Sequence, residues 1–247
     1  MDLKKRGSQT AKDGFNNEKD IVTKFNNWEK DKTAQEWLKI TGYKLKEIEF
    51  VEAIIISGYK TDVQVQVRIK LKKAIDVENL QVKLVSNTKD FNQIDKRKVD
   101  KYIEMWNIPD NISKILKKYT GEIQPTIKNP RDKRRTFMNE FSKKTQETLI
   151  NWLEKNKSLI VNDIIKGRGK FAAEWMLVAQ KTNEKARWVL KPINFVINYF
   201  GNGKVIITPR GSVKIGKITM QRKGGDGGRE TAKMLQFKIN PAELFDV

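Results

Sequence analysis

Residues 61–83, TDVQVQVRIKLKKAIDVENLQVK, decide the fold because they hold two candidate strands. Apolar and polar residues alternate over 63–69, and this period of two is typical of a half-buried strand. The charged segment 72–79 predicts a turn, and residues 80–85 (LQVKLV) predict a second strand. We therefore expect the two strands to pair in a sheet.

Three polar side chains should meet at one end of this strand pair. Asp62 precedes the first strand, while Gln81 and Lys83 share one face of the second because successive side chains alternate across a strand. Carboxylate and carboxamide oxygens bind hard divalent cations, and an ammonium group can steady a phosphate or orient a water. The pattern predicts Asp62, Gln81 and Lys83 as catalytic residues, with Asp62 and Gln81 as ligands of Mg²⁺.

The same residues resemble a known nuclease site. Thr-Asp at 61–62 and Gln-x-Lys at 81–83 are similar to the PD-(D/E)XK pattern, with Gln81 in place of the usual second acid. Longer segments resemble the type II restriction endonucleases of this superfamily that cut GCGC, the HinP-type, MspI-like enzymes. These segments are 12–15 (KDGF), 58–59 (GY), 91–94 (FNQI), 220–229 (MQRKGGDGGR), 234–238 (MLQFK) and 243–246 (ELFD). The short catalytic pattern is weak by itself, whereas the long C-terminal match is specific.

This resemblance implies an α/β fold with a central mixed β-sheet flanked by helices. It also implies a Mg²⁺-dependent enzyme that makes double-strand cuts at GCGC, after the first G. Asp62, Gln81 and the carbonyl of Val82 would hold the metal, and Lys83 would orient the attacking water or stabilise the pentacovalent phosphorus. An acid of the first helix often reaches the metal in this superfamily, which makes Glu18 a further candidate ligand. The alternative for Glu18 is a solvated side chain on a lysine-rich helix.

The composition favours a polyanionic partner and excludes several classes of catalytic and metal site. Lysine and arginine number 50 against 30 acidic residues, so the net charge is +20. The chain has no cysteine and no histidine. This excludes zinc fingers, thiolate metal sites, cysteine nucleophiles, Ser-His-Asp triads and nucleases that need a catalytic histidine. Carboxylate, amide, lysine and an oxygen-bound metal remain for phosphoryl chemistry.

The length of 247 residues suits one large domain or two small ones, and 38% hydrophobic residues suffice for a core. We expect a single domain over 1–247, with a catalytic core in about 11–100 and a β-rich DNA-reading part in about 200–247. No apolar run approaches the length of about 20 residues that spans a membrane. The basic N-terminus is not followed by the apolar core of a signal peptide, so the expected location is the bacterial cytoplasm.

Periodicity predicts further elements around the central strands. A helix is expected over 11–28, with Asp13 as its cap, and a strand over 50–57 should be buried on both faces. The strands of the last fifth are expected at the end of the central sheet. The other predicted helices are 33–40, 99–106, 111–119, 142–155 and 192–199, and the other predicted strands are 171–181, 187–190, 205–208, 213–222 and 235–239.

The segment after the catalytic strand is a candidate DNA contact. Asn87, Asn92 and Gln93 carry amides that can pair with base edges, and Lys96 follows them. Phe91 can pack on bases or wedge between them. The alternative is an ordinary loop with an Asx turn and with Phe91 in the core.

Two basic segments predict phosphate contacts that position the protein without reading sequence. Arg134 and Arg135 belong to a run of five basic residues over 128–135, and Arg168 belongs to the glycine-flanked turn 167–170. The run 128–135 is equally compatible with an exposed helix start.

A glycine-rich hairpin over 221–229 is the main candidate for reading bases. Gln221, Arg222, Lys223 and Arg229 can donate to guanine, and Asp226 can accept from cytosine N4. Donors and acceptors on one hairpin suit a site made of G·C pairs. The alternative is a flexible tip with a salt bridge.

The expected partners are double-stranded DNA and, functionally, a cognate DNA methyltransferase, with no membrane and with a monomeric or weakly dimeric protein. Two other classes of function stay open. A repair or recombination nuclease of the same superfamily would recognise DNA shape, and a non-enzymatic basic module would bind nucleic acid without Mg²⁺ and without cleavage.

Overall fold

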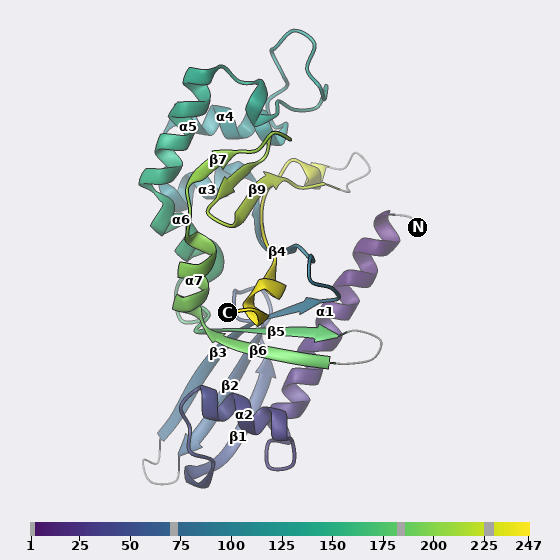
Figure 1. The fold of residues 1–247 in the computed structure, drawn as a ribbon, viewed down its shortest axis with the longest axis vertical. Helices are drawn as coiled ribbons and strands as arrows, with labels where there is room; N and C mark the ends of the chain where they lie inside the picture. Colours follow the sequence, from purple (N-terminus) through teal and green to yellow (C-terminus); the bar gives the residue numbers. More distant parts are fainter. Residues whose placement is uncertain (1–2, 70–73, 182–185, 225–229) are drawn as a thin grey trace. The chain divides into compact units, whose positions relative to one another are not determined.

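The structure is a computed structural model that describes residues 3–69, 74–181, 186–224 and 230–247, and their strands form two five-stranded sheets (Figure 1). The chain divides into two compact units. Unit 1 comprises Met1–Asp90, Ile165–Val196 and Asn240–Val247, and unit 2 comprises Phe91–Ile164 and Ile197–Ile239. Unit 1 thus gathers segments from both halves of the chain and extends beyond the predicted core of about 11–100. The prediction of one domain over 1–247 stays a prediction.

The sheet of unit 1 is mixed and has the strand order β1-β2-β3-β5-β6. The central strand β3 pairs antiparallel with β2 and parallel with β5. The predicted central mixed sheet is therefore confirmed. The strands are β1 (Ile48–Ile55), β2 (Val63–Ile69), β3 (Ala74–Val85), β5 (Trp175–Lys181) and β6 (Ala186–Pro192).

Two helices supply the apolar layer against this sheet. α1 (Leu3–Asn26) lies along β1, β2 and β3 (Figure 1), and α2 (Lys32–Ile40) begins after Asp31, whose side chain accepts a hydrogen bond from Ala34 N at 3.0 Å. The core cluster includes Ile21 and Phe25 of α1 as well as Val63, Val65, Leu80 and Val82 of the strands. Burial of this stripe fixes α1 on the strands that carry the predicted site.

Three local predictions for unit 1 were wrong. α1 begins at Leu3, so Asp13 lies inside the helix and is not its cap. Burial along β1 alternates, with Ala53 3% and Ile54 38% exposed, because only one face of this strand packs in the core. The predicted turn over 72–79 is mostly strand, since β3 pairs with β2 from Ala74 onward and this pairing overrides the local preference of charged residues.

The sheet of unit 2 is antiparallel, with the strand order β4-β10-β9-β8-β7. The C-terminal strands were expected at the end of the central sheet and instead form this separate one. The physical reason is that β10 is already paired on both edges, with β4 and with β9. The strands are β4 (Asn92–Arg97), β7 (Val205–Ile207), β8 (Val213–Ile215), β9 (Ile218–Arg222) and β10 (Leu235–Ile239).

Helices of unit 2 enclose an aromatic core. Tyr102 stacks on Trp106 with ring centroids 4.6 Å apart, and both contact the edge of Phe237. The helices are α3 (Val99–Trp106), α4 (Asp110–Thr120) and α5 (Lys143–Lys155), close to their predicted bounds. α6 (Lys157–Ile165) and α7 (Ile193–Gly201) contain positions at which the chain passes from one unit to the other. Within the described ranges, no helix is long and apolar enough to cross a membrane.

Candidate active site and DNA-contacting surfaces

The start of β2 brings Asp62 against β3. Pairing of β2 with β3 stops at Val63 and Leu80, so Asp62 stands at the end of the ladder. Its N–H donates to Leu80 O at 2.9 Å, and its Oδ2 accepts from the N–H of Val82 at 2.6 Å. The Asp62 carboxylate thus accepts the hydrogen bond that a neighbouring strand would otherwise accept from Val82. This bond fixes the position and the rotamer of the Asp62 side chain.

Lys83 lies beside the same carboxylate. Its Nζ is 3.8 Å from Asp62 Oδ2, and the two side chains are 13% and 25% exposed, respectively. Lys83 and Gln81 are two residues apart on β3 and therefore point to the same face. The structure thus brings the selected acid and lysine together and places the selected amide on the same face of β3 as the lysine.

Gln81 carries an unsatisfied buried acceptor. The residue is 2% exposed, and within the described residues its Oε1 has no hydrogen-bond partner. Leaving such an acceptor unsatisfied costs about 1–3 kcal/mol, so a buried group of this kind calls for a ligand. A carbonyl-type oxygen beside a carboxylate fits a hard divalent cation, and the residues present therefore fit a metal of this class.

Glu18 of α1 lies near this pair. Burial and the neighbouring Asp62 carboxylate raise the pKa of Glu18 to about 7, and Lys83 lowers it in part. The Glu18 side chain is therefore half-buried and close enough to Asp62 and Lys83 to feel their charges. It is not the fully solvated side chain of the alternative interpretation. No group of three or more His, Cys, Asp or Glu in the described part of the chain is arranged to hold a metal, so a metal here would rely on Gln81 as well as on carboxylates.

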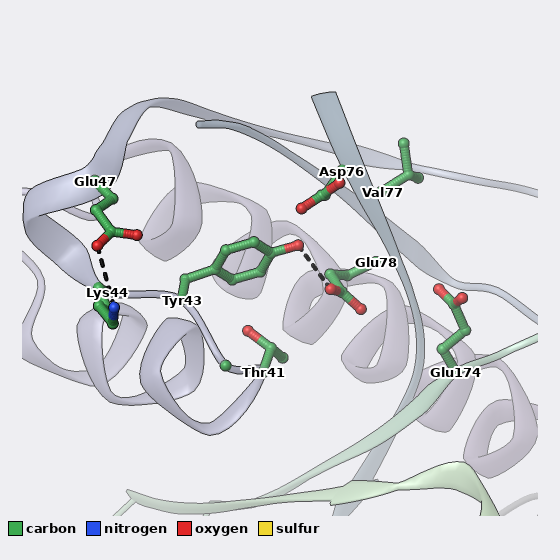
Figure 2. Close-up of a pocket in the computed structure, with 9 residues that line it drawn as sticks. Thr41, Tyr43, Lys44, Glu47, Asp76, Val77, Glu78 and Glu174 are labelled. Carbon is green, nitrogen blue, oxygen red and sulfur yellow. Dashed lines mark hydrogen bonds and ion pairs between the residues drawn. The ribbon is translucent and has the colours of Figure 1, made fainter. Parts of the chain in front are cut away.

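A different pocket of unit 1, of about 450 Å³, is acidic (Figure 2). Within it Glu78 accepts hydrogen bonds from Tyr43 Oη at 2.8 Å and from Trp175 Nε1 at 2.7 Å, and burial raises the pKa of Glu78. Glu78 and Gln81 are three residues apart on β3 and point to opposite faces. The pocket is therefore separate from the Asp62 site, and its negative charge opposes a polyanion. Its lining comprises Thr41, Gly42, Tyr43, Lys44, Glu47, Asp76, Val77, Glu78 and Glu174.

In unit 2, a row of amides crosses three strands. Gln236 of β10 lies opposite Lys96 of β4 and Gln221 of β9. Its Nε2 donates to Gln93 Oε1 at 2.7 Å, and Gln221 Nε2 is 3.4 Å from its Oε1. The structure thus joins predicted DNA contacts from two distant segments. Gln236 was missed, although its alternation with Leu235 and Phe237 was the available signal.

Lys96 and Lys223 extend this row. Burial and, to a smaller extent, the charge of Lys223 lower the pKa of Lys96. The two ammonium groups therefore lie close enough to repel one another. Two nearby cations that repel one another favour an anionic partner. The predicted tip residues Asp226 and Arg229 lie outside the described residues.

Two predicted arginines are instead engaged within unit 2. Arg222 Nε donates to Thr120 O, the last residue of α4, at 2.9 Å. Arg135 lies over the Phe137 ring, 3.9 Å from its centroid, and burial lowers its pKa. Arg134 is exposed and bonds Asp132 Oδ1 through Nε at 2.9 Å. Residues 131–137 are not helical, and of the predicted arginines that the structure describes in this unit Arg134 is the most accessible.

The segment after β3 combines both readings of its sequence. Asn87 Oδ1 accepts from Lys89 N at 2.9 Å, which is the local Asx turn of the ordinary alternative. Phe91, however, is 49% exposed and is not in the core. Asn92 begins β4 opposite Ile239. The segment after β3 therefore presents the aromatic side chain of Phe91 to solvent beside polar residues.

The other predicted phosphate contact, Arg168, lies on the turn 167–170 of unit 1 and is exposed.

Comparison with known proteins agrees with this geometry. A family model described as R.HinP1I restriction endonuclease matches residues 41–245. A solved structure of the restriction endonuclease MspI in complex with its cognate DNA is similar, with a TM-score of 0.67 and 17% identity over 95% of this chain and 92% of that one. This second likeness shows the fold. No curated protein matches the chain. The chain belongs to the R.HinP1I restriction endonuclease family and is a type II site-specific deoxyribonuclease.

Proposed function

We propose that this enzyme cuts both strands of DNA at GCGC, after the first G, with Mg²⁺ as its cofactor. Restriction endonucleases of this kind generally use divalent metal ions. The observation that carries the proposal is the buried Gln81 Oε1, which lacks a partner among the described residues. Gln81 shares a face of β3 with Lys83, whose Nζ is 3.8 Å from the fixed Asp62 carboxylate. An amide oxygen and a carboxylate are ligands suited to Mg²⁺.

Each residue of the site has a separate role in this proposal. Asp62, Gln81 and the carbonyl of Val82 would hold the ion, with Glu18 as a further carboxylate. The bound ion would supply Lewis-acid stabilisation of phosphoryl charge and a more acidic water. The Val82 N–H holds Asp62 in place, so the carboxylate needs no rearrangement when substrate binds. Lys83 stabilises negative charge at phosphorus or orients the attacking water through its Nζ.

Recognition of GCGC would fall to unit 2. Amides donate and accept, and lysine donates to guanine, so the row formed by Gln93, Lys96, Gln221, Lys223 and Gln236 suits G·C pairs. Asn87, Asn92, Arg222, Asp226 and Arg229 stay proposed base contacts, while Arg134, Arg135 and Arg168 stay proposed backbone contacts. The resemblance of the 220–229 segment to GCGC-cutting enzymes supports this sequence in particular.

The functional partner, the oligomeric state and the location belong to the same proposal. A cell that makes this nuclease needs its own sites protected, so a cognate DNA methyltransferase is the functional partner. We further propose a monomer or weak dimer in the bacterial cytoplasm. Methylated plasmid should resist cleavage, and sedimentation at two protein concentrations measures the oligomeric state.

The direct test is incubation with unmethylated plasmid DNA, with Mg²⁺ or with a chelator, followed by sequencing of the ends. We expect Mg²⁺-dependent double-strand ends that all map to GCGC after the first G. Cleavage at another fixed sequence would remove the GCGC assignment alone. Equal cleavage with chelator present would remove the metal from the mechanism. Membership in a restriction endonuclease family argues against a shape-specific repair nuclease and against a non-enzymatic module.

A further inference from the structure

Two loops of unit 1 form an aromatic and basic patch beside Asp62. The rings of Tyr59 and Phe171 are 4.4 Å apart at an angle of 50°, and Lys170 Nζ lies 5.0 Å from the Phe171 ring centroid. The side chain of Lys60 crosses Gly167 so closely that a Cβ there would come within 2.4 Å of Lys60 Cγ. The aromatic–basic patch comprises Tyr59, Lys60, Lys166, Arg168, Lys170 and Phe171.

Buried hydrogen bonds attach the second loop to the strands that carry the candidate active site. Thr61, which is fully buried and precedes Asp62, donates through Oγ1 to Phe171 O at 2.9 Å. Asn79 of β3, 7% exposed, donates through Nδ2 to Lys170 O at 3.2 Å. Gln64 of β2 donates in turn to Asn79 Oδ1 at 3.0 Å. The patch is therefore held rigidly on β2 and β3.

The chemistry of the patch suits a sugar–phosphate backbone. Residues 57–61 and 166–173 contain four basic side chains and no acidic one. Tyr59 is 58% exposed, although it is an aromatic residue fixed by a neighbouring ring. Lysine and arginine bind phosphate oxygens, a tyrosine hydroxyl donates to them, and the ring can pack on a deoxyribose. An acidic peptide would satisfy the charges but would leave the exposed ring without a matching apolar surface.

The distance from the active site sets which phosphates are in reach. Tyr59 is three residues from Asp62, so their Cα atoms are separated by at most about 11 Å. One DNA strand rises about 3.4 Å per nucleotide along the duplex axis. A strand whose cleaved phosphate lies at Asp62 would therefore pass the patch within about three nucleotides of that phosphate.

We propose that the aromatic–basic patch binds the backbone of the cleaved strand within about three nucleotides of the scissile phosphate, with Tyr59 as a positioning residue. This inference rests on the proposed function, because it takes Asp62 as the point of cleavage. The patch reads no bases. It holds the strand in line so that the phosphate meets Asp62 and Lys83 in a productive orientation.

The test is a scan with neutral phosphates. Duplexes that contain the sequence cut by the wild type carry one methylphosphonate at a time, within five nucleotides of the cut on either side. Binding is measured without divalent metal for the wild type and for Tyr59→Ala, Tyr59→Phe, Arg168→Ala and Phe195→Ala. Phe195 is the matched control, because it is a 40% exposed ring of unit 1 with Lys191 Nζ 5.0 Å from its centroid.

We expect one or two neutral linkages within about three nucleotides of the cut to weaken wild-type binding about 10-fold, the value of one charge-assisted hydrogen bond. In Tyr59→Ala and Arg168→Ala the same linkages should cost less than about 2-fold, since the contact is already lost. Tyr59→Phe should retain most of the penalty if ring packing dominates, and Phe195→Ala should show the full wild-type pattern.

The inference is overturned if Tyr59→Ala and Arg168→Ala, with unfolding temperatures equal to the wild type, retain every linkage penalty. A merely structural role for Tyr59 would lower the unfolding temperature and leave the linkage pattern unchanged. Failure of the proposed function has a different signature, because the wild-type protein would then not cut plasmid DNA with Mg²⁺ at all.

Discussion

The Asp62 site of unit 1 and the amide row of unit 2 are built in contrasting ways. Asp62 stands at the end of the β2–β3 ladder and contacts β3, the strand that carries Gln81 and Lys83. The amide row joins Gln221 and Gln236, 15 residues apart on neighbouring strands, to Gln93 of β4, which is 143 residues from Gln236. The proposed chemistry thus rests on a local strand pair, and the proposed reading surface also needs a long-range pairing. The variants described next test whether cleavage depends on unit 1 and sequence discrimination on unit 2.

The largest expected effect is on the chemical step. Asp62→Asn keeps an acceptor for the Val82 N–H but removes the charge, and Lys83→Ala removes the ammonium group. Each should reduce the cleavage rate by about 10³-fold or more, the loss of several kcal/mol of transition-state stabilisation, while specific DNA binding is largely kept. Single-turnover cleavage and binding of the same duplex measure the two quantities.

The control for this pair is Asp110→Asn, which alters an exposed Asp–Lys contact, Asp110 with Lys114, on α4. It should leave the cleavage rate within about 2-fold of the wild type, as exposed pairs contribute little. A variant of Asp62 or Lys83 with near-normal turnover would remove that residue from the active site.

The next effect concerns Gln81. Gln81→Glu adds an anionic oxygen at nearly constant size, so we expect retained or partly retained activity with a lower Mg²⁺ requirement. Gln81→Ala should be far worse because it removes the only oxygen of the side chain. Cleavage rates over a Mg²⁺ titration compare the two variants. If the alanine and glutamate variants behave alike, Gln81 is not a ligand.

Specificity should respond to the amide row. Lys223→Ala or Gln221→Ala should lower discrimination between GCGC and its single-base variants by about 1–3 kcal/mol, the value of one bidentate base contact. The sequence pattern predicts the same for Arg222→Ala. Because Arg222 Nε bonds Thr120 O, we now expect this variant also to lose about 1 kcal/mol of folding free energy.

Competition binding with the single-base variants and chemical denaturation separate these two outcomes. Full discrimination in both Lys223→Ala and Gln221→Ala would place the reading element elsewhere. Loss of discrimination in Arg222→Ala with unchanged stability would show that its guanidinium leaves Thr120 to contact DNA.

The smallest effect is expected for Arg134, an exposed side chain bonded to Asp132. Arg134→Ala should weaken binding to all DNA sequences about equally and should reduce the slope of log K against log salt by about 0.9, one phosphate contact. Measurements of affinity from low to moderate salt, on cognate and unrelated duplexes, test this. Erosion of discrimination in Arg134→Ala would contradict a backbone role.

Several local elements were predictable because their causes are local. The alternation that begins at Val63 predicted the start of β2, and Ser142 predicted the start of α5. The failures have equally specific causes. Charged residues after Ile69 predicted a turn, but pairing with β2 holds β3 in strand from Ala74 onward. The phosphate contact of Arg135 stays a prediction, and Phe137 and Tyr119 lie beside its guanidinium.

The sequence by itself determined the proposed catalytic set, because Asp62, Gln81 and Lys83 need only one strand pair and a period of two to be selected together. It also determined the polyanionic partner through the net charge of +20 and excluded histidine and cysteine chemistry. Only the tertiary structure decided that the C-terminal strands leave the central sheet and pair with β4. It likewise decided that Tyr59 meets Phe171 and that Gln236 meets Gln93. These contacts join residues more than a hundred positions apart, and no periodicity within a short window encodes such pairings.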